Sequence, residues 1–270
     1  MKLDLRAVLL GLATAATAAI SAQAQSGAQS GATHDWSGAF LGLSVDQVRS
    51  DLSGASSTEY VAPGYSYGST YFQSSSVPAV NALGLFDFSS DDTEATLHGG
   101  YSEQRGWLVY GLELDLGTSG AGGSQTVTGS YPCCSYLTTA MRTDVSTDWT
   151  AALRSTVGYA RGDWLFYATA GIAAAQVKSS FLFSDTAGFT GQGSATDTLL
   201  GYTAGLGVAR AITDRLSLRV QYLHSDYGST SYASNDFRYS GAAFPDTVMT
   251  QKTSLTSDRI SIGLTLALGG

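Results

Sequence analysis

The sequence predicts an all-β protein, an eight-stranded antiparallel up-and-down transmembrane β-barrel with short turns at one end and long loops at the other. Three observations support this fold class. The 270 residues include 32 Gly and 15 Tyr but only 4 Pro, and only 13% are charged. Eight segments alternate apolar with small or polar residues at the period of two that a strand requires. Tight turns alternate with long connections between these segments, as is typical of membrane β-barrels.

Residues 1–24 are predicted to be a cleaved signal peptide. Lys2 and Arg6 form a short basic region, residues 7–20 are uncharged and mainly apolar, and Ala22-Gln23-Ala24 supplies small residues for cleavage. The apolar run is shorter than the ~20 residues that a membrane helix needs. Residues 25–34, rich in Ser, Gly and Ala, form a flexible lead-in, and residues 35–270 form the barrel. We therefore expect the mature protein to leave the cytoplasm.

The stretch 107–117 shows the strand pattern most clearly. One face is continuously apolar, with Leu108, Tyr110, Leu112, Leu114 and Leu116, and the other carries Val109, Gly111, Glu113 and Asp115. In a membrane barrel the leucines would face lipid and the carboxylates a polar lumen. The same alternation predicts the other seven strands, which cover 36–46, 93–102, 148–160, 164–178, 197–211, 216–227 and 255–268.

The connections between these strands differ sharply in length. Residues 103–106, 161–163 and 213–215 form tight turns, whereas 47–92, 118–146, 179–196 and 228–253 form long polar loops. In outer-membrane barrels the short turns are periplasmic and the long loops extracellular. Both termini are therefore expected in the periplasm.

Several phrases, in order, resemble one family of barrels. They are Asp35-Trp36-Ser37-Gly38-Ala39-Phe40-Leu41-Gly42, His98-Gly99-Gly100-Tyr101, Val109-Tyr110-Gly111-Leu112-Glu113-Leu114-Asp115, Trp149-Thr150-Ala151-Ala152-Leu153-Arg154, Gly201-Tyr202-Thr203-Ala204-Gly205 and Tyr222-Leu223-His224-Ser225-Asp226-Tyr227-Gly228. The family is that of the porin-like outer-membrane immunogenic proteins of alphaproteobacteria, small eight-stranded relatives of the OmpA transmembrane domain. The resemblance implies a place in the cell outer membrane, contact with its lipid, and insertion by the barrel-assembly machinery. The family usually ends on an aromatic residue, whereas this sequence ends Leu266-Ala267-Leu268-Gly269-Gly270.

The lumen face gathers charged and titratable side chains. Because an eight-stranded barrel is only wide enough for side chains to fill it, charges there should pair with one another. We expect a polar network that plugs the lumen, and the alternatives are a narrow gated conduit or a proton-handling role. The candidate residues are Glu94, His98, Glu113, Asp115, Arg154, Arg219 and Arg259.

Aromatic residues near the strand ends are expected to lie at the membrane interfaces. They are Trp36, Trp107, Trp149, Trp164 and Tyr222. Cys133 and Cys134 fall in a long extracellular connection, where oxidation can close a local disulfide that stiffens the loop or join one cysteine to another molecule. The pair lacks the nearby His or second Cys pair of a zinc site.

The sequence favours a structural or surface protein over other classes. A net charge of -8 argues against nucleic-acid binding, and we expect no enzyme, cofactor or metal. His224 and Asp226 match only part of the site of barrel proteases. The alternatives are a small porin for ions or small solutes, and an adhesin or receptor that binds host or phage partners through loops such as the Tyr-rich 47–92. A soluble lipid-binding barrel is disfavoured by the charged lumen.

Overall fold

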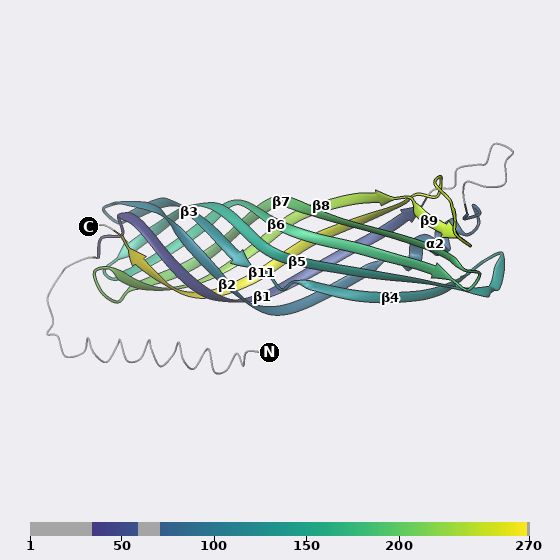
Figure 1. Ribbon diagram of the computed structural model, residues 1–270. Helices are drawn as coiled ribbons and strands as arrows, with labels where there is room; N and C mark the ends of the chain where they lie inside the picture. The colour runs from purple at the N-terminus through teal and green to yellow at the C-terminus, as the bar shows by residue number, and fades with distance from the viewer. Residues whose placement is uncertain (1–33, 59–70, 269–270) are drawn as a thin grey trace.

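The chain folds into a closed antiparallel β-barrel whose strands continue beyond one end of the barrel into a long extension (Figure 1). The computed structural model describes residues 34–58 and 71–268. The expected signal peptide and nearly all of the lead-in lie outside the described residues, as do 59–70 and 269–270. The described residues form eleven strands and one helix. No helix within these ranges is both long and apolar enough to cross a membrane.

Eight strands close the barrel, which confirms the predicted fold class. Each pairs antiparallel with the next in chain order, and the first pairs with the last from Phe40↔Ala267 to Thr58↔Met249. The strands are β1 (Gly38–Thr58), β2 (Phe86–Arg105), β3 (Leu108–Thr118), β5 (Cys134–Arg161), β6 (Trp164–Asp185), β7 (Phe189–Ala211), β8 (Leu216–Ser234) and β11 (Met249–Ala267).

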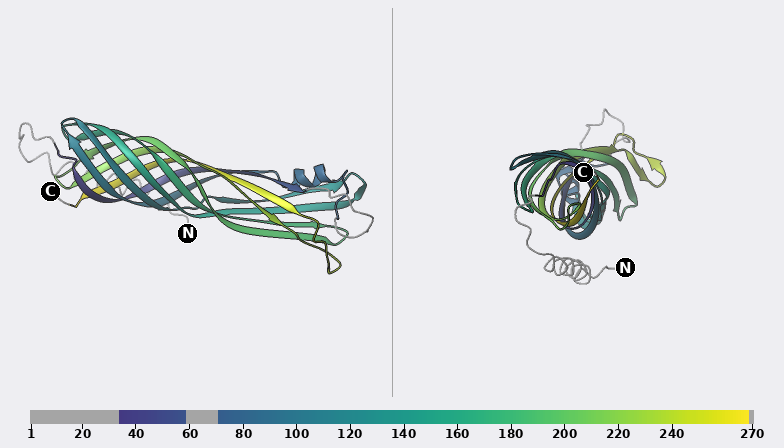
Figure 2. Two further views of the ribbon diagram at one scale, coloured as in Figure 1. Left: turned by 90° about the horizontal axis from the view of Figure 1, so that it is seen from above. Right: turned by 90° about the vertical axis from the view of Figure 1, so that its left-hand side faces the viewer.

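Tight turns join the strand pairs at one end, here called the turn end, where both ends of the described chain also lie (Figure 2). Two residues separate β2 from β3, and Gly106 has a φ of 65°. Gly162, with a φ of 60°, holds the same place between β5 and β6. Glycine at positive φ in the first central position is what type II′ hairpin turns require, so local sequence fixes these turns.

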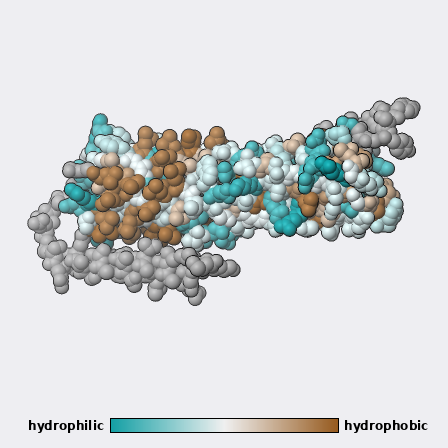
Figure 3. Space-filling view, viewed as in Figure 1, coloured by the Kyte–Doolittle hydropathy of each residue, from teal (hydrophilic) through white to brown (hydrophobic). Residues whose placement is uncertain are grey.

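Every barrel strand exposes apolar side chains near the turn end, so that they form a belt around the barrel; Figure 3 shows one face of this belt. On β3, Leu112, Leu114 and Leu116 are about half exposed, whereas Glu113 and Asp115 between them are only 6% exposed. The period-two pattern therefore turns leucine outward and carboxylate inward, as the sequence predicts for a barrel in lipid. The belt also includes Leu41, Leu43, Leu97, Leu153, Val157, Phe166, Ile172, Leu200, Leu206, Ile260, Leu264 and Leu266.

The strands run well beyond the predicted boundaries, so the long loops are mostly strand. The expected loop 47–92 contains the second half of β1, helix α2 (Val77–Leu83) and the start of β2. The loop 118–146 forms a hairpin of β4 (Gly122–Tyr131) with β5. The loop 179–196 narrows to a short turn after Asp185, and 228–253 contains β9 (Asp236–Tyr239) and β10 (Ala242–Ala243).

The extension consists of two sheets, although the barrel below it is one closed sheet. The ladder between β2 and β3 stops at Thr96↔Gly117, and that between β7 and β8 stops at Tyr202↔Asp226. Farther from the turn end, and within the described part of the chain, β2 forms no ladder with β4, and β7 forms none with β8. One sheet therefore has the order β2-β1-β11-β8, and the other β4-β5-β6-β7-β9-β10.

Side chains fill the interior in successive layers along the barrel axis. A turn-end cluster of Val109, Ala160, Leu165, Tyr167 and Ala209 is followed by the charged lumen residues. A middle cluster lies above them and includes Leu52, Phe86, Val145, Leu199 and Leu255. An upper cluster between the two sheets of the extension includes Phe72, Val80, Leu83, Tyr131, Met141, Phe181, Phe183, Phe189, Phe237 and Met249.

Candidate functional site

The lumen within the apolar belt holds two ion-pair clusters, and the first is built on Glu113. Arg219 binds Glu113 with two hydrogen bonds, from Nη1 to Oε2 at 2.7 Å and from Nη2 to Oε1 at 2.9 Å. Arg154 Nη2 donates to Glu113 Oε1 and lies 2.6 Å from Asp115 Oδ2. Arg219 also donates to Gln221 Oε1 at 2.5 Å. Two guanidinium groups thus balance two carboxylates, which is the pairing that buried charges require.

The second cluster lies one layer farther from the turn end and is built on Arg259. Its Nη1 is 3.1 Å from Asp46 Oδ2, and its Nη2 is 3.0 Å from Glu94 Oε2. Thr96 Oγ1 accepts a hydrogen bond from Arg259 Nη1 at 2.8 Å and donates to Asp46 Oδ2 at 2.5 Å. Thr150 Oγ1 accepts from Nη2 at 3.2 Å. One guanidinium therefore links strands β11, β1, β2 and β5 across the lumen.

Glycine makes room for the second cluster. A Cβ on Gly117 would lie 2.9 Å from Thr96 Oγ1, 3.0 Å from Thr150 Oγ1 and 3.4 Å from Arg259 Nη1. The first distance is shorter than real Cβ atoms show and the other two are tight, so a side chain here would force its neighbours to shift in a close-packed interior. Glycine at this position in β3 is therefore part of the site.

His98 lies in the same lumen but outside both clusters. It is 2% exposed, and its Nε2 is 2.9 Å from Thr265 Oγ1. The other six predicted lumen residues all belong to one of the two clusters. Asp46, fully buried, is a member that the sequence reasoning missed. It is the last residue of the first predicted strand. The period of two places it on the same inward face as Gly42 and Ser44, and this signal could have identified it.

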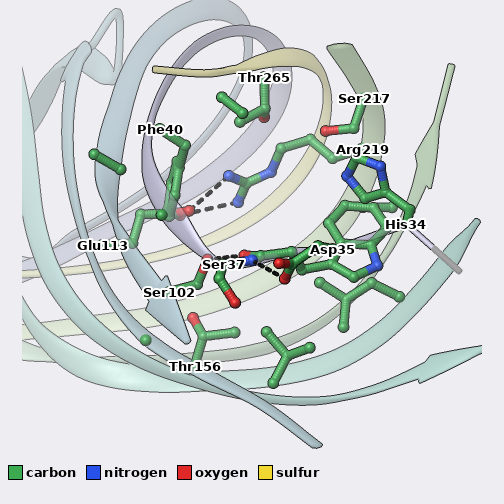
Figure 4. Close-up of a pocket in the computed structure, with 18 of the residues that line it drawn as sticks. His34, Asp35, Ser37, Phe40, Ser102, Glu113, Thr156, Ser217, Arg219 and Thr265 are labelled. Atoms are coloured by element: carbon green, nitrogen blue, oxygen red, sulfur yellow. Dashed lines mark hydrogen bonds and ion pairs between the residues drawn. The ribbon is translucent and has the colours of Figure 1, made fainter. Parts of the chain in front are cut away.

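At the turn end the lumen opens into a cavity of about 100 Å³ (Figure 4). Its inner wall carries Glu113 and Arg219, joined by their two hydrogen bonds, and its mouth carries His34, Asp35 and Ser37. The first cluster thus forms the inner limit of a pocket that faces the turn end.

Trp36 lines this cavity, which corrects the expectation that it lies at the lipid interface. Its side chain packs on the lumen-facing turn-end cluster. Its backbone N–H donates to Gln104 Oε1 at 2.9 Å, and its carbonyl accepts from Ser102 Oγ. Because the strand begins only at Gly38, whose φ is 116°, Trp36 lies outside the strand alternation and turns into the mouth.

The other four predicted interface aromatics are on the outer surface. Trp107 is 62% exposed and contacts Tyr159, with ring centroids 5.7 Å apart. The Trp164 ring lies under the Arg210 guanidinium at 5.2 Å. Trp149 and Tyr222 are also partly exposed beside the apolar belt.

The tip of the extension is organised around Asp185. Its Oδ2 accepts hydrogen bonds from the phenols of Tyr71 at 2.7 Å and Tyr131 at 2.9 Å. Its Oδ1 accepts from the backbone N–H groups of Ala187 and Phe189, both at 2.9 Å. Burial first, and then the bond to Asp185, raise the pKa of both phenols above their usual range. Tyr71 also stacks on Phe189 with ring centroids 3.5 Å apart.

Two other predicted features lie outside the lumen. Cys133 and Cys134 sit at the tip of the β4–β5 hairpin as free thiols, with their Sγ atoms 2.7 Å apart. His224 lies on the outer wall, where its Nδ1 is 2.9 Å from Asp258 Oδ1, while Asp226 caps the backbone N–H of Gly228.

Among residues 34–58 and 71–268, no group of three His, Cys, Asp or Glu side chains is placed to hold a metal.

Sequence comparison finds relatives among bacterial outer-membrane proteins, although no family model matches the chain. A "22 kDa outer membrane protein" of Rhizobium leguminosarum bv. viciae is 33% identical over 154 residues, which cover 54% of this chain and 60% of that protein. A "25 kDa outer-membrane immunogenic protein" of Brucella abortus is 30% identical, over 53% of this chain and 55% of that protein. The matched part thus spans less than two thirds of these curated relatives.

Solved structures also align with most of the chain. The outer membrane protein OprG from Pseudomonas aeruginosa covers 87% of this chain and 98% of its own, with 9% identity and a TM-score of 0.48. Neisserial surface protein A covers 86% and 98%, with 11% identity and a TM-score of 0.37. From the sequence relatives and the closed barrel with its apolar belt, we conclude that the chain is an outer-membrane β-barrel protein, similar to outer membrane proteins of alphaproteobacteria.

Proposed function

We propose that this protein is a sealed outer-membrane barrel with a structural and surface role and without catalysis. Its lumen blocks ions within the membrane, and its extension carries a rigid surface away from the cell.

The observation that carries the proposal is the burial of the lumen residues in the two ion-pair clusters. The Arg154 side chain is 0% exposed, those of Glu113 and Asp115 are each 8% exposed, and that of Asp46 is 0% exposed. The apolar middle cluster lies beyond the charged residues on the side of the extension, and on the other side the turn-end cluster lines the cavity in front of them. An ion that crosses the lumen would have to break buried, hydrogen-bonded charge pairs, which is strongly unfavourable.

Single-channel recording in planar bilayers tests the seal. The refolded wild-type protein should be silent. Arg154→Ala, which leaves Asp115 without its cation and opens space, should add a leak, whereas Arg142→Ala on the outer surface of the extension should not. Regular conductance steps from the wild type would instead establish a small porin lined by the same charges.

An adhesin role is the second candidate, and the length of the extension favours it. The tip exposes aromatic side chains, with Tyr136 81% and Tyr239 39% exposed, and exposed aromatic residues are enriched where proteins bind partners. Cells that display the protein should adhere to cultured epithelial cells more than cells without it. A Tyr136→Ser, Tyr239→Ser variant should lose this gain, and adhesion that is equal in all three strains would exclude the role.

A further inference from the structure

The two cysteines of the chain lie side by side at the point where the β4–β5 hairpin reverses. The sequence contains no others, so any disulfide within one molecule must join Cys133 to Cys134. Their Sγ atoms are 2.7 Å apart. Cys133 is exposed, while Cys134 packs against the upper cluster. The pair is therefore accessible on one side and anchored on the other.

Ring closure needs only a small movement of the sulfur atoms but produces a strained product. A disulfide bond is about 2.05 Å long, so the two atoms must approach by less than ~1 Å. Adjacent Cα atoms are only about 3.8 Å apart, below the range of roughly 4.4–6.8 Å that relaxed disulfides show. Strained and exposed disulfides are the easily reduced ones. The geometry thus favours a labile bond over a permanent structural link.

We propose that Cys133 and Cys134 form a reversible redox site on the outer tip, which closes to a vicinal disulfide by exchange with a small-molecule disulfide. The Cys133 thiolate, having lost its proton to solvent, attacks one sulfur of the small disulfide and releases one small thiolate. Cys134 then loses its proton, attacks Cys133 Sγ and releases the second small thiolate. The two protons end on the released thiols, the protein loses two electrons, and the small disulfide gains them.

The order of the two attacks follows from the thiol–thiol contact. Cys134 donates its S–H to Cys133 Sγ, and this hydrogen bond raises the pKa of the Cys134 thiol. Cys133 is the acceptor and is exposed, so it meets the small disulfide first. Cys134, partly covered by the upper cluster, resolves the mixed disulfide.

Closure of the ring would change contacts between the β4–β5 turn and the rest of the tip. Cys134 pairs with Tyr131, and the next ladder pair is Ser130↔Thr138 beyond a register shift. Tyr131 in turn donates to Asp185, and Cys133 Sγ lies 4.0 Å from Ser76 Oγ, directly before helix α2. A change in the turn therefore reaches the contacts that hold the tip together.

Peptide mass spectrometry of the refolded full chain tests the proposal. After incubation with oxidised glutathione, the peptide that contains both cysteines should be lighter by two hydrogen atoms and resist alkylation by iodoacetamide. Buffers with a rising share of reduced glutathione should restore two alkylated thiols. Hydrogen exchange of residues 131–138 should differ between the two states.

A Cys134→Ser variant separates the two steps, because it keeps the exposed thiol but removes the resolving one. It should accumulate a mixed disulfide with glutathione at Cys133, which the wild type does not. The proposal is overturned if wild-type cysteines stay fully alkylatable after oxidation, if the product is a disulfide-linked dimer, or if reduced glutathione cannot reopen the ring.

Discussion

Arg154→Met should destabilise the barrel strongly, because it leaves a buried carboxylate without a cation. Arg154 Nη2 is the only guanidinium nitrogen among the described residues that forms an ion pair with Asp115. Glu113 keeps its two-bond contact with Arg219, but Asp115 would remain 6% exposed and unpaired. Removing one partner of a buried pair costs about 3–5 kcal/mol. We expect a loss of that size in the free energy of unfolding.

The assay is urea unfolding of the protein in lipid vesicles, followed by the gel mobility difference between folded and unfolded barrel. The decisive comparison is the double variant Arg154→Met, Asp115→Leu, which removes both charges. Replacing a buried ion pair by apolar residues is often neutral, so this variant should recover most of the lost stability. Arg142→Met, which breaks an exposed pair with Asp144, is the matched control and should unfold like the wild type. The reasoning fails if Arg154→Met is as stable as the wild type, or if the double variant is less stable than the single one.

Three further predictions follow from other parts of the molecule. In single-tryptophan variants, brominated lipids should quench Trp107 but not Trp36, since only Trp107 faces the membrane; equal quenching would contradict the lumen placement. Gly117→Leu should prevent correct packing around Arg259 and lower stability by about 1–3 kcal/mol, the usual cost of overpacking, whereas Gly117→Ala should cost less. The raised pKa of Tyr131 means that the folded tip keeps its phenol proton while the unfolded chain loses it above about pH 10. The contribution of this phenol to the free energy of unfolding is therefore complete below about pH 10 and declines above it. In urea unfolding, Tyr131→Phe should show a smaller loss of stability at alkaline pH than the wild type.

The barrel itself could be predicted from the sequence because its signals are local. Alternation of leucine with carboxylate between Leu108 and Leu116 fixes one strand and both of its faces, and Gly106 and Gly162 mark two turns. The extension could not be predicted because many of its strand segments are rich in Ser, Thr and Gly and resemble loops in composition. In the part of β1 beyond residue 46, for example, only Val48 and Leu52 mark the inward face with apolar side chains.

Most members of the two lumen clusters could be predicted, with the exception of Asp46, whereas their pairing could not. Strand alternation places Glu113, Arg154 and Arg219 on the inner face, yet it does not say which guanidinium meets which carboxylate. That choice depends on the tilt and stagger of the closed barrel, which arise from all eight strands together. Trp36 was misplaced for a related reason, since it lies just before the strand and the strand period no longer governs it.

The second cluster also bears on how the barrel assembles. Arg259 lies on the last strand, and its partner Asp46 lies on the first, 213 residues earlier. Until β11 docks against β1, Asp46 and Glu94 have no guanidinium within the described chain to balance them. The ion pairs of this cluster therefore form only when the barrel closes. Contacts between residues so far apart in the sequence are slow to form. A barrel whose last strand has not docked holds Asp46 and Glu94 without their guanidinium partner, so the docking of β11 balances these charges and stabilises the completed ring.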